Sequence, residues 1–130
     1  MEDLYREIIL DHYENPRNYG VLPDPDISYE DDNPLCGDRI RIDMKIRDGR
    51  IVDVRFSGKG CAISQASASM LTERIKGATV EEARSLTRED VLAMLGIPLG
   101  PARIKCALLA LKVLKAGLYR LPKIDWEELD

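Results

Sequence analysis

The sequence predicts an α+β fold in which helices accompany an antiparallel β-hairpin. The hairpin is predicted by apolar residues that alternate with charged ones over 40–47, followed by the typical two-residue turn Asp48-Gly49. Apolar residues at helical spacing predict helices over 3–14 and 102–118. A chain of 130 residues suits one hydrophobic core, so a single domain is expected.

In the first half of the chain, the helix over 3–14 is predicted to end at Asn15-Pro16, because proline disfavours helical continuation. Residues 17–38 are rich in glycine and proline, and only Ile27–Tyr29 is expected to form a short strand there. The inward-facing residues of the hairpin are expected to be Ile40, Ile42, Met44, Ile46, Val52, Val54 and Phe56.

In the second half, a helix is predicted from about residue 64 to residue 76, and its first turns carry small residues that allow close packing on a sheet. Thr79–Glu82 has the spacing of a capping box, and Thr87 is predicted to cap another helix that ends at Gly96. Pro101 suits the first position of the last helix. That helix is expected to bury one stripe, formed by Ile104, Ala107, Leu108, Leu111, Leu114 and Leu118.

Composition excludes several classes of protein. With 45% hydrophobic and 32% charged residues the chain is typical of globular proteins, and no apolar run approaches the roughly 20 residues that span a bilayer. A net charge of −4 argues against nucleic-acid binding. The acidic residues of the first helix are unlike a signal peptide, so we expect a cytoplasmic protein with no membrane partner.

The sequence has three cysteines, and its predicted hairpin brings two of them together. Cys36 precedes the first strand and Cys61 follows the second, so antiparallel pairing places both at the same end. Cys106 lies in the first two turns of the last helix, where the helix dipole, Arg103 and Lys105 would favour a thiolate. Without further information, all three could equally be small buried apolar residues.

Asp38 makes this group of residues more informative. Three thiols and one carboxylate could complete the shell of a thiophilic ion, and the weaker carboxylate ligand suits a site that exchanges its contents. Alternatively, Asp38 is simply a turn residue after Gly37. The neighbouring bases could offset the charge of the site or form an ordinary solvated surface; they are Arg39, Lys59, Arg103 and Lys105. The sole histidine, His12, is expected to pack between helices rather than to bind metal.

Four segments together resemble the U-type iron–sulfur cluster assembly proteins, the IscU, NifU N-terminal and SufU family: DHYENPRNYG, NPLCGDRI, GKGCAISQASASML and ARIKC. The resemblance implies one domain over 1–130 with two layers, in which helices pack on one face of a three-stranded antiparallel sheet. It also implies that Cys36, Cys61 and Cys106 are the ligand cysteines and that Asp38 is the carboxylate ligand. Lys105 stands where IscU-like members have histidine, so the site is more similar to that of SufU, which binds zinc.

The same resemblance implies that the protein accepts sulfur from a cysteine desulfurase and assembles or relays a transient [2Fe–2S] cluster, with Zn²⁺ in the resting state. Cys36 is the expected persulfide acceptor, and Cys106 is the alternative. Downstream partners would be apo iron–sulfur proteins or cluster carriers. Such a protein is a scaffold or sulfur carrier rather than a conventional enzyme. The competing hypotheses are a zinc-dependent sulfurtransferase that holds no cluster, a module with structural zinc, and a thiol-redox enzyme.

Overall fold

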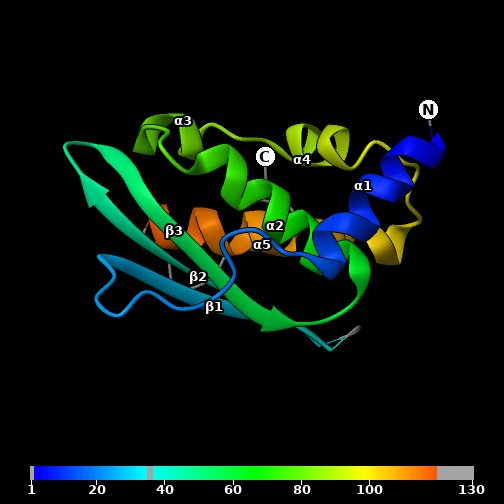
Figure 1. Ribbon diagram of the computed structural model, residues 1–130, viewed down its shortest axis with the longest axis horizontal. Helices are drawn as coiled ribbons and strands as arrows, with labels where there is room; N and C mark the ends of the chain where they lie inside the picture. The colour runs from blue at the N-terminus through cyan, green and yellow to red at the C-terminus, as the bar shows by residue number, and fades with distance from the viewer. Residues whose placement is uncertain (1, 35–36, 120–130) are drawn as a thin grey trace.

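The structure is a computed structural model that describes residues 2–34 and 37–119. The elements follow one another along the chain as Figure 1 shows: α1 (Glu2–Glu14), β1 (Ile27–Asn33), β2 (Asp38–Arg47), β3 (Arg50–Lys59), α2 (Ala62–Ile75), α3 (Val80–Arg84), α4 (Arg88–Leu95) and α5 (Pro101–Tyr119). The predicted α+β class is therefore confirmed. No helix in the described part of the chain is both long and apolar enough to cross a membrane.

The sheet is antiparallel, with its three strands in the order β1-β2-β3. The predicted turn joins β2 to β3, and both of its residues have positive φ (Asp48 52°, Gly49 76°), as a hairpin turn that matches the strand twist requires. The strand predicted over Ile27–Tyr29 is longer than expected and runs to Asn33. Its acidic second half has low β propensity, but pairing with β2 satisfies its backbone, as far as Asn33 opposite Asp38.

Helices α2 and α5 contact the sheet and form the second layer (Figure 1). The small residues of α2, among them Ala66, Ser67 and Ala68, are fully buried, as their size predicts. The single buried stripe expected for α5 is wrong, because residues from Cys106 to Leu118 are buried on all sides. The helix contacts β1 and β2 as well as α2, α3 and α4. Even Lys112 is therefore only 9% exposed, and it forms an ion pair with Asp31 on β1 (3.3 Å).

The opposite face of the sheet contains a buried carboxylate. Asp43 occupies an outward position of β2, yet it is 1% exposed. Its Oδ2 accepts a hydrogen bond from the backbone N–H of Leu22 (3.2 Å), and its Oδ1 accepts from Ser28 Oγ (2.6 Å) and Arg41 Nε (2.9 Å). The segment between α1 and β1 is therefore fastened onto β2 through this side chain.

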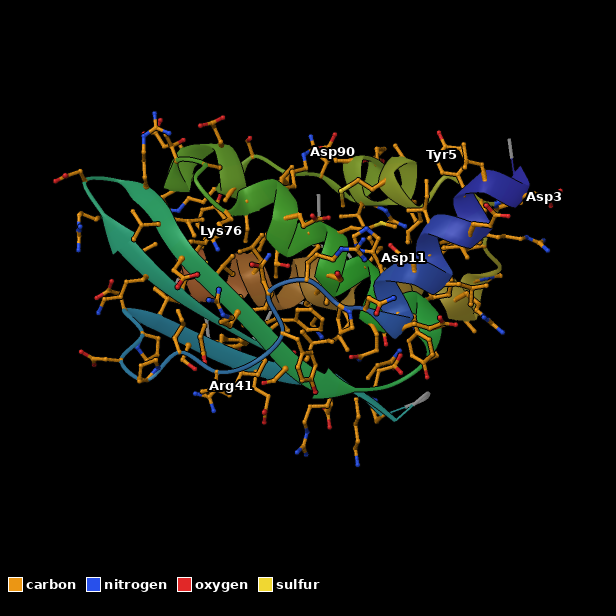
Figure 2. The ribbon with its side chains drawn as sticks, viewed as in Figure 1. Asp3, Tyr5, Asp11, Arg41, Lys76 and Asp90 are labelled. Atoms are coloured by element: carbon orange, nitrogen blue, oxygen red, sulfur yellow. The ribbon has the colours of Figure 1, made fainter. Side chains whose placement is uncertain are left out.

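The short helices begin as the sequence predicts. Thr79 and Glu82 form a capping box at α3, and Thr87 forms one with Asp90 at α4. Gly96 ends α4 in the left-handed conformation (φ 69°). Tyr5 extends from α1 toward this end of α4 (Figure 2), and a Cβ added at Gly96 would lie 2.3 Å from the Tyr5 ring.

Candidate metal centre

Three of the predicted ligands converge at one end of the sheet. Asp38 begins β2, Cys61 directly precedes α2, and Cys106 lies in the second turn of α5. One ligand atom from each lies within 4.8 Å of the others. Cys36, the fourth predicted ligand, lies outside the described residues. Residues far apart in the sequence thus meet because two strands and two helices begin or end here.

The carboxylate of Asp38 is held in a defined orientation. It is 0% exposed, and its Oδ1 accepts a hydrogen bond from the backbone N–H of Cys61 (2.9 Å). Its Oδ2 lies 4.0 Å from Cys61 Sγ. One oxygen is therefore occupied by the protein, whereas the other faces the thiol.

The donor set fits a thiophilic divalent ion. Zinc–sulfur and zinc–oxygen bonds of about 2.0–2.3 Å place the ligands of a tetrahedral zinc ion roughly 3.5–3.8 Å apart. The 4.0 Å between Asp38 Oδ2 and Cys61 Sγ is close to that separation. Two sulfurs and one carboxylate oxygen are also a composition that zinc accepts. These three side chains could hold a metal with at least one further ligand.

Helix orientation favours negative charge at this position. Cys61 is the N-cap of α2, and Cys106 lies near the start of α5, so the positive ends of two helix dipoles are directed toward the thiols. Both cysteines also contact the smaller apolar cluster that contains Ile63 and Ala107. Apolar surroundings strengthen electrostatic interactions within the site.

Access to the centre is limited to one side. Asp38 and Cys106 are buried, at 0% and 5% exposure, whereas Cys61 is partly exposed. Solvent or a partner can therefore reach the described donors most directly at Cys61, beside the exposed residues Gly37 and Lys59.

The supporting bases predicted from the sequence lie nearby in the chain without direct contact. Arg103 is exposed and Lys105 is partly buried in the first turns of α5, and within the ranges 2–34 and 37–119 neither forms an ion pair with Asp38. Arg39 instead lies 4.0 Å from Glu30 on β1. Arg39 therefore pairs with a residue of β1 and not with the carboxylate of the site.

His12 has the helix-packing role predicted for it. Its Nδ1 lies 2.8 Å from Ser69 Oγ on α2, and Ser69 Oγ also accepts the backbone N–H of Arg17. Burial lowers the pKa of the His12 imidazole below its usual value of 6.5, and the nearby Arg17 adds to this effect. A neutral ring suits a buried contact between α1 and α2.

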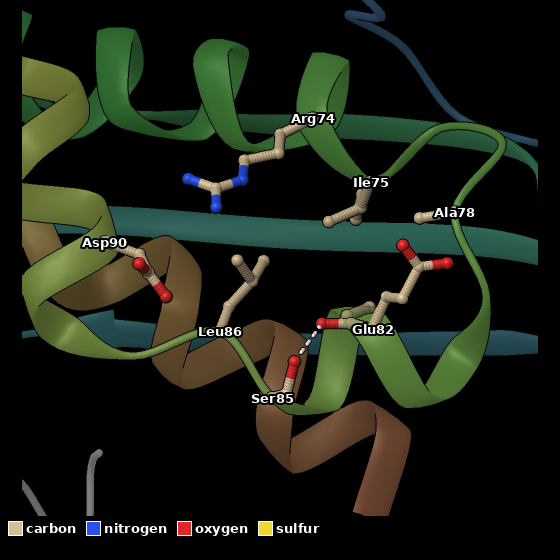
Figure 3. A pocket seen from close by; sticks show the side chains of 8 residues that line it. Arg74, Ile75, Ala78, Glu82, Ser85, Leu86 and Asp90 are labelled. Carbon is tan, nitrogen blue, oxygen red and sulfur yellow. Dashed lines mark hydrogen bonds between the residues drawn. The ribbon is translucent and has the colours of Figure 1, made fainter.

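The structure also has a small cavity of about 220 Å³ between α2, α3 and α4 (Figure 3). It lies at the C-terminal end of α2, a helix of 14 residues, and therefore about 20 Å from the cysteines at the other end. Two of its carboxylates already cap helices. Glu82 accepts a hydrogen bond from the Thr79 N–H, and Asp90 accepts one from the Thr87 N–H. Its polar groups thus have structural roles, and we assign it none in the chemistry.

Two features of the centre were not predicted from the sequence. The first is the hydrogen bond from the Cys61 backbone N–H to the Asp38 carboxylate. Ser64 was also missed; its hydroxyl is fully buried and donates to the carbonyl of Cys61 (3.1 Å). The motif GKGCAIS contains Cys61 and Ser64, but a backbone donor leaves no signal in the identity of a side chain.

A three-stranded sheet with helices on one face, and with two cysteines and a buried aspartate gathered at one end, defines a small α+β domain with a candidate metal site. Comparison with known families identifies it further. The model of the NifU-like N-terminal domain matches residues 4–127, and the chain belongs to this family.

Individual relatives agree with this assignment. The chain is 46% identical over 138 aligned positions to the zinc-dependent sulfurtransferase SufU of Bacillus subtilis, with 92% of each chain covered. It is 40% identical to the iron–sulfur cluster assembly scaffold protein IscU 1 of Archaeoglobus fulgidus, covering 88% of this chain and 74% of the relative. Among solved structures, a NifU-like N-terminal protein of Brucella abortus superposes with a TM-score of 0.76 at 28% identity, covering 92% of this chain and 95% of that one.

Proposed function

We propose that the protein works in iron–sulfur cluster assembly: it accepts sulfur from a cysteine desulfurase and assembles or relays a transient cluster. The observation that carries this proposal is the convergence of Asp38, Cys61 and Cys106 within 4.8 Å at one end of the fold. Cys36 is proposed as the fourth ligand, which gives three thiolates and one carboxylate. Its reactive thiols suit a reducing compartment, so we also propose a cytoplasmic location.

Sulfur acceptance is a thiol exchange that needs no external oxidant or reductant. A thiolate of this chain attacks the terminal sulfur of the desulfurase persulfide, and a new S–S bond forms on this chain. The S–S bond of the desulfurase breaks, and its cysteine leaves as a thiolate. One thiolate is consumed and one is released, so charge and electrons balance. Zinc, when bound, would keep the thiols deprotonated and protected from oxidation.

We propose Cys36 as the acceptor, with Cys106 as the alternative. Cys106 is 5% exposed in the second turn of a buried helix, so an incoming persulfide reaches it only if the surroundings move. Cys36 lies outside the described residues, but its neighbour in the sequence, Gly37, is exposed. A partner approaches an exposed segment more easily than a buried helical position.

The test is a single-turnover reaction with a cysteine desulfurase and free cysteine, followed by mass spectrometry of the intact chain. The expected product of the unaltered protein carries the mass of one added sulfur atom on Cys36. Cys36→Ser should abolish this product, whereas Cys106→Ser should retain it. Transfer that persists in Cys36→Ser but is lost in Cys106→Ser would move the acceptor to the helix. No transfer to any cysteine would contradict the proposal.

A second candidate is a zinc-dependent sulfurtransferase that never holds a cluster. It is favoured by the carboxylate ligand and by the 46% identity to a protein of that name. Anaerobic reconstitution with iron, sulfide and reductant separates the two. A [2Fe–2S] spectrum that transfers to an apo iron–sulfur protein supports the assembly role. Failure to hold any cluster, with sulfur transfer intact, supports the sulfurtransferase instead. If zinc stays bound and sulfur transfer is absent, the result supports the third hypothesis, a binding module in which zinc is structural.

A further inference from the structure

We infer that Gly60 is a positioning residue for the metal centre. Because glycine has no side chain, it leaves free the space that the Asp38 carboxylate occupies. The inference rests on the proposed metal site and deepens it. It concerns the end of β3, where the strand leaves the sheet and turns toward α2 (Figure 1).

The strand register places Gly60 opposite Asp38. Ile40 pairs with Gly58 and Arg39 pairs with Lys59, so the next position along would set Asp38 against Gly60. Side chains of directly opposed residues lie on the same face of a sheet, with their Cβ atoms about 5 Å apart. A side chain at position 60 would therefore be a direct cross-strand neighbour of the Asp38 side chain.

In the structure, the Asp38 carboxylate lies closer to position 60 than ordinary contact distances would allow for a side chain there. A Cβ added to Gly60 would lie 2.2 Å from Asp38 Oδ1, 2.8 Å from Asp38 Cγ and 2.7 Å from Ser64 Oγ. The carboxylate thus occupies the volume that a side chain at position 60 would fill. From there Oδ1 accepts the N–H of Cys61 at 2.9 Å, and Oδ2 is left toward the thiols.

A methyl group at position 60 would displace the Asp38 carboxylate by contact with its Oδ1. Carbon–oxygen contacts are ordinarily about 3.3 Å or more, so Oδ1 would have to move by about 1 Å. A functional group must be held to within about 0.5 Å of its productive position. The move would break the hydrogen bond to the Cys61 N–H and turn Oδ2 away from the metal, without removing any ligand from the chain.

The experiment measures Zn²⁺ affinity by competition with a chromophoric chelator, and records the visible ligand-field spectrum of the Co²⁺-substituted protein. Gly60→Ala is expected to weaken Zn²⁺ binding by about 10–100-fold, the usual effect of losing a group that orients a ligand. Its Co²⁺ spectrum should shift toward that of Asp38→Ala. In the Asp38→Ala background, the same substitution should weaken binding by less than about threefold, because its target is already gone.

Gly20→Ala is the matched control. Gly20 has a similar backbone conformation (φ 140°, against 153° for Gly60), but nothing lies within 4 Å of an added Cβ. This variant reports the cost of backbone strain alone, and it should bind Zn²⁺ as the unaltered protein does. Equal losses of Zn²⁺ affinity in Gly20→Ala and Gly60→Ala would overturn the inference. It would also be overturned if the loss of affinity caused by Gly60→Ala added in full to the loss caused by Asp38→Ala.

Thermal unfolding of the metal-free proteins keeps the test decisive if Gly60→Ala folds poorly. Asp38→Ala should recover part of the stability lost in Gly60→Ala, since it removes two of the three atoms nearest to the added Cβ and leaves Ser64 Oγ; absence of any rescue would count against the contact. If the unaltered protein binds neither Zn²⁺ nor Co²⁺, the proposed function itself fails. If the unaltered protein and Gly60→Ala both bind the two ions with the same affinity and the same Co²⁺ spectrum, only the positioning role of Gly60 fails.

Discussion

Replacing Asp43 by alanine should destabilise the protein far more than replacing a similar aspartate on the same face of the sheet. Asp43 is 1% exposed and accepts three hydrogen bonds, from Leu22 N–H, Ser28 Oγ and Arg41 Nε. Hydrogen bonds to a charged group contribute about 1.5–3 kcal/mol each, but these donors are partly exposed and can be rehydrated. We therefore take about 1 kcal/mol for each, or about 3 kcal/mol in total.

Asp53→Ala is the matched comparison. Asp53 also lies two residues from an arginine that contacts it, Arg55, but its side chain is 33% exposed. Asp53 also lies 3.6 Å from Lys76. Exposed ion pairs contribute about 0.2–1 kcal/mol each, so the loss of both pairs should stay below about 2 kcal/mol.

The assay is denaturant and thermal unfolding of the metal-free protein. For a chain of this size, 1 kcal/mol corresponds to roughly 4 °C in Tm, so Asp43→Ala should lower Tm by about 12 °C. If Asp43→Ala costs no more than Asp53→Ala, the segment between α1 and β1 is not held by this carboxylate, and the reasoning is refuted.

Three further predictions concern pH, packing and metal. Burial lowers the pKa of His12 below 6.5, so in acid the unfolded chain binds more protons at this residue than the folded chain does. The free energy of unfolding should therefore fall as pH drops from about 6.5 toward 5. In urea unfolding, His12→Gln should make this fall smaller. Gly96→Ala should cost about 1–3 kcal/mol because its methyl meets the Tyr5 ring, whereas Gly77→Ala, with open space around it, should cost less; calorimetry showing equal costs would contradict this. Removing metal with a chelator should lower the Tm of the unaltered protein by several degrees, and Cys61→Ser should abolish the chelator effect.

Local chemistry explains why much of the fold could be predicted. The Asp48-Gly49 turn and both capping boxes depend on residues within four positions of each other, and all three lie where the sequence predicts. The hairpin brings Cys61 beside Asp38. Cys36, which the hairpin was predicted to place beside Cys61, lies outside the described residues.

The errors arose where distant segments decide the outcome. The second half of β1 is acidic and was expected to be loop, but Asp31 is neutralised by Lys112, a residue of α5 that is 81 positions away. Asp43 has the outward position of an alternating strand, yet it is 1% exposed and accepts a hydrogen bond from the backbone N–H of Leu22, a residue of the segment between α1 and β1. Such contacts depend on tertiary packing, which overrides local propensity.

The most direct test of the account is the metal content of protein purified without air, with its absorption spectrum. The proposed site predicts about one zinc per chain and no iron–sulfur charge-transfer bands at rest, and Asp38→Ala and Cys61→Ser should each reduce the zinc content. Absence of metal, or zinc that is retained in full when Asp38 and Cys61 are both replaced, would contradict it.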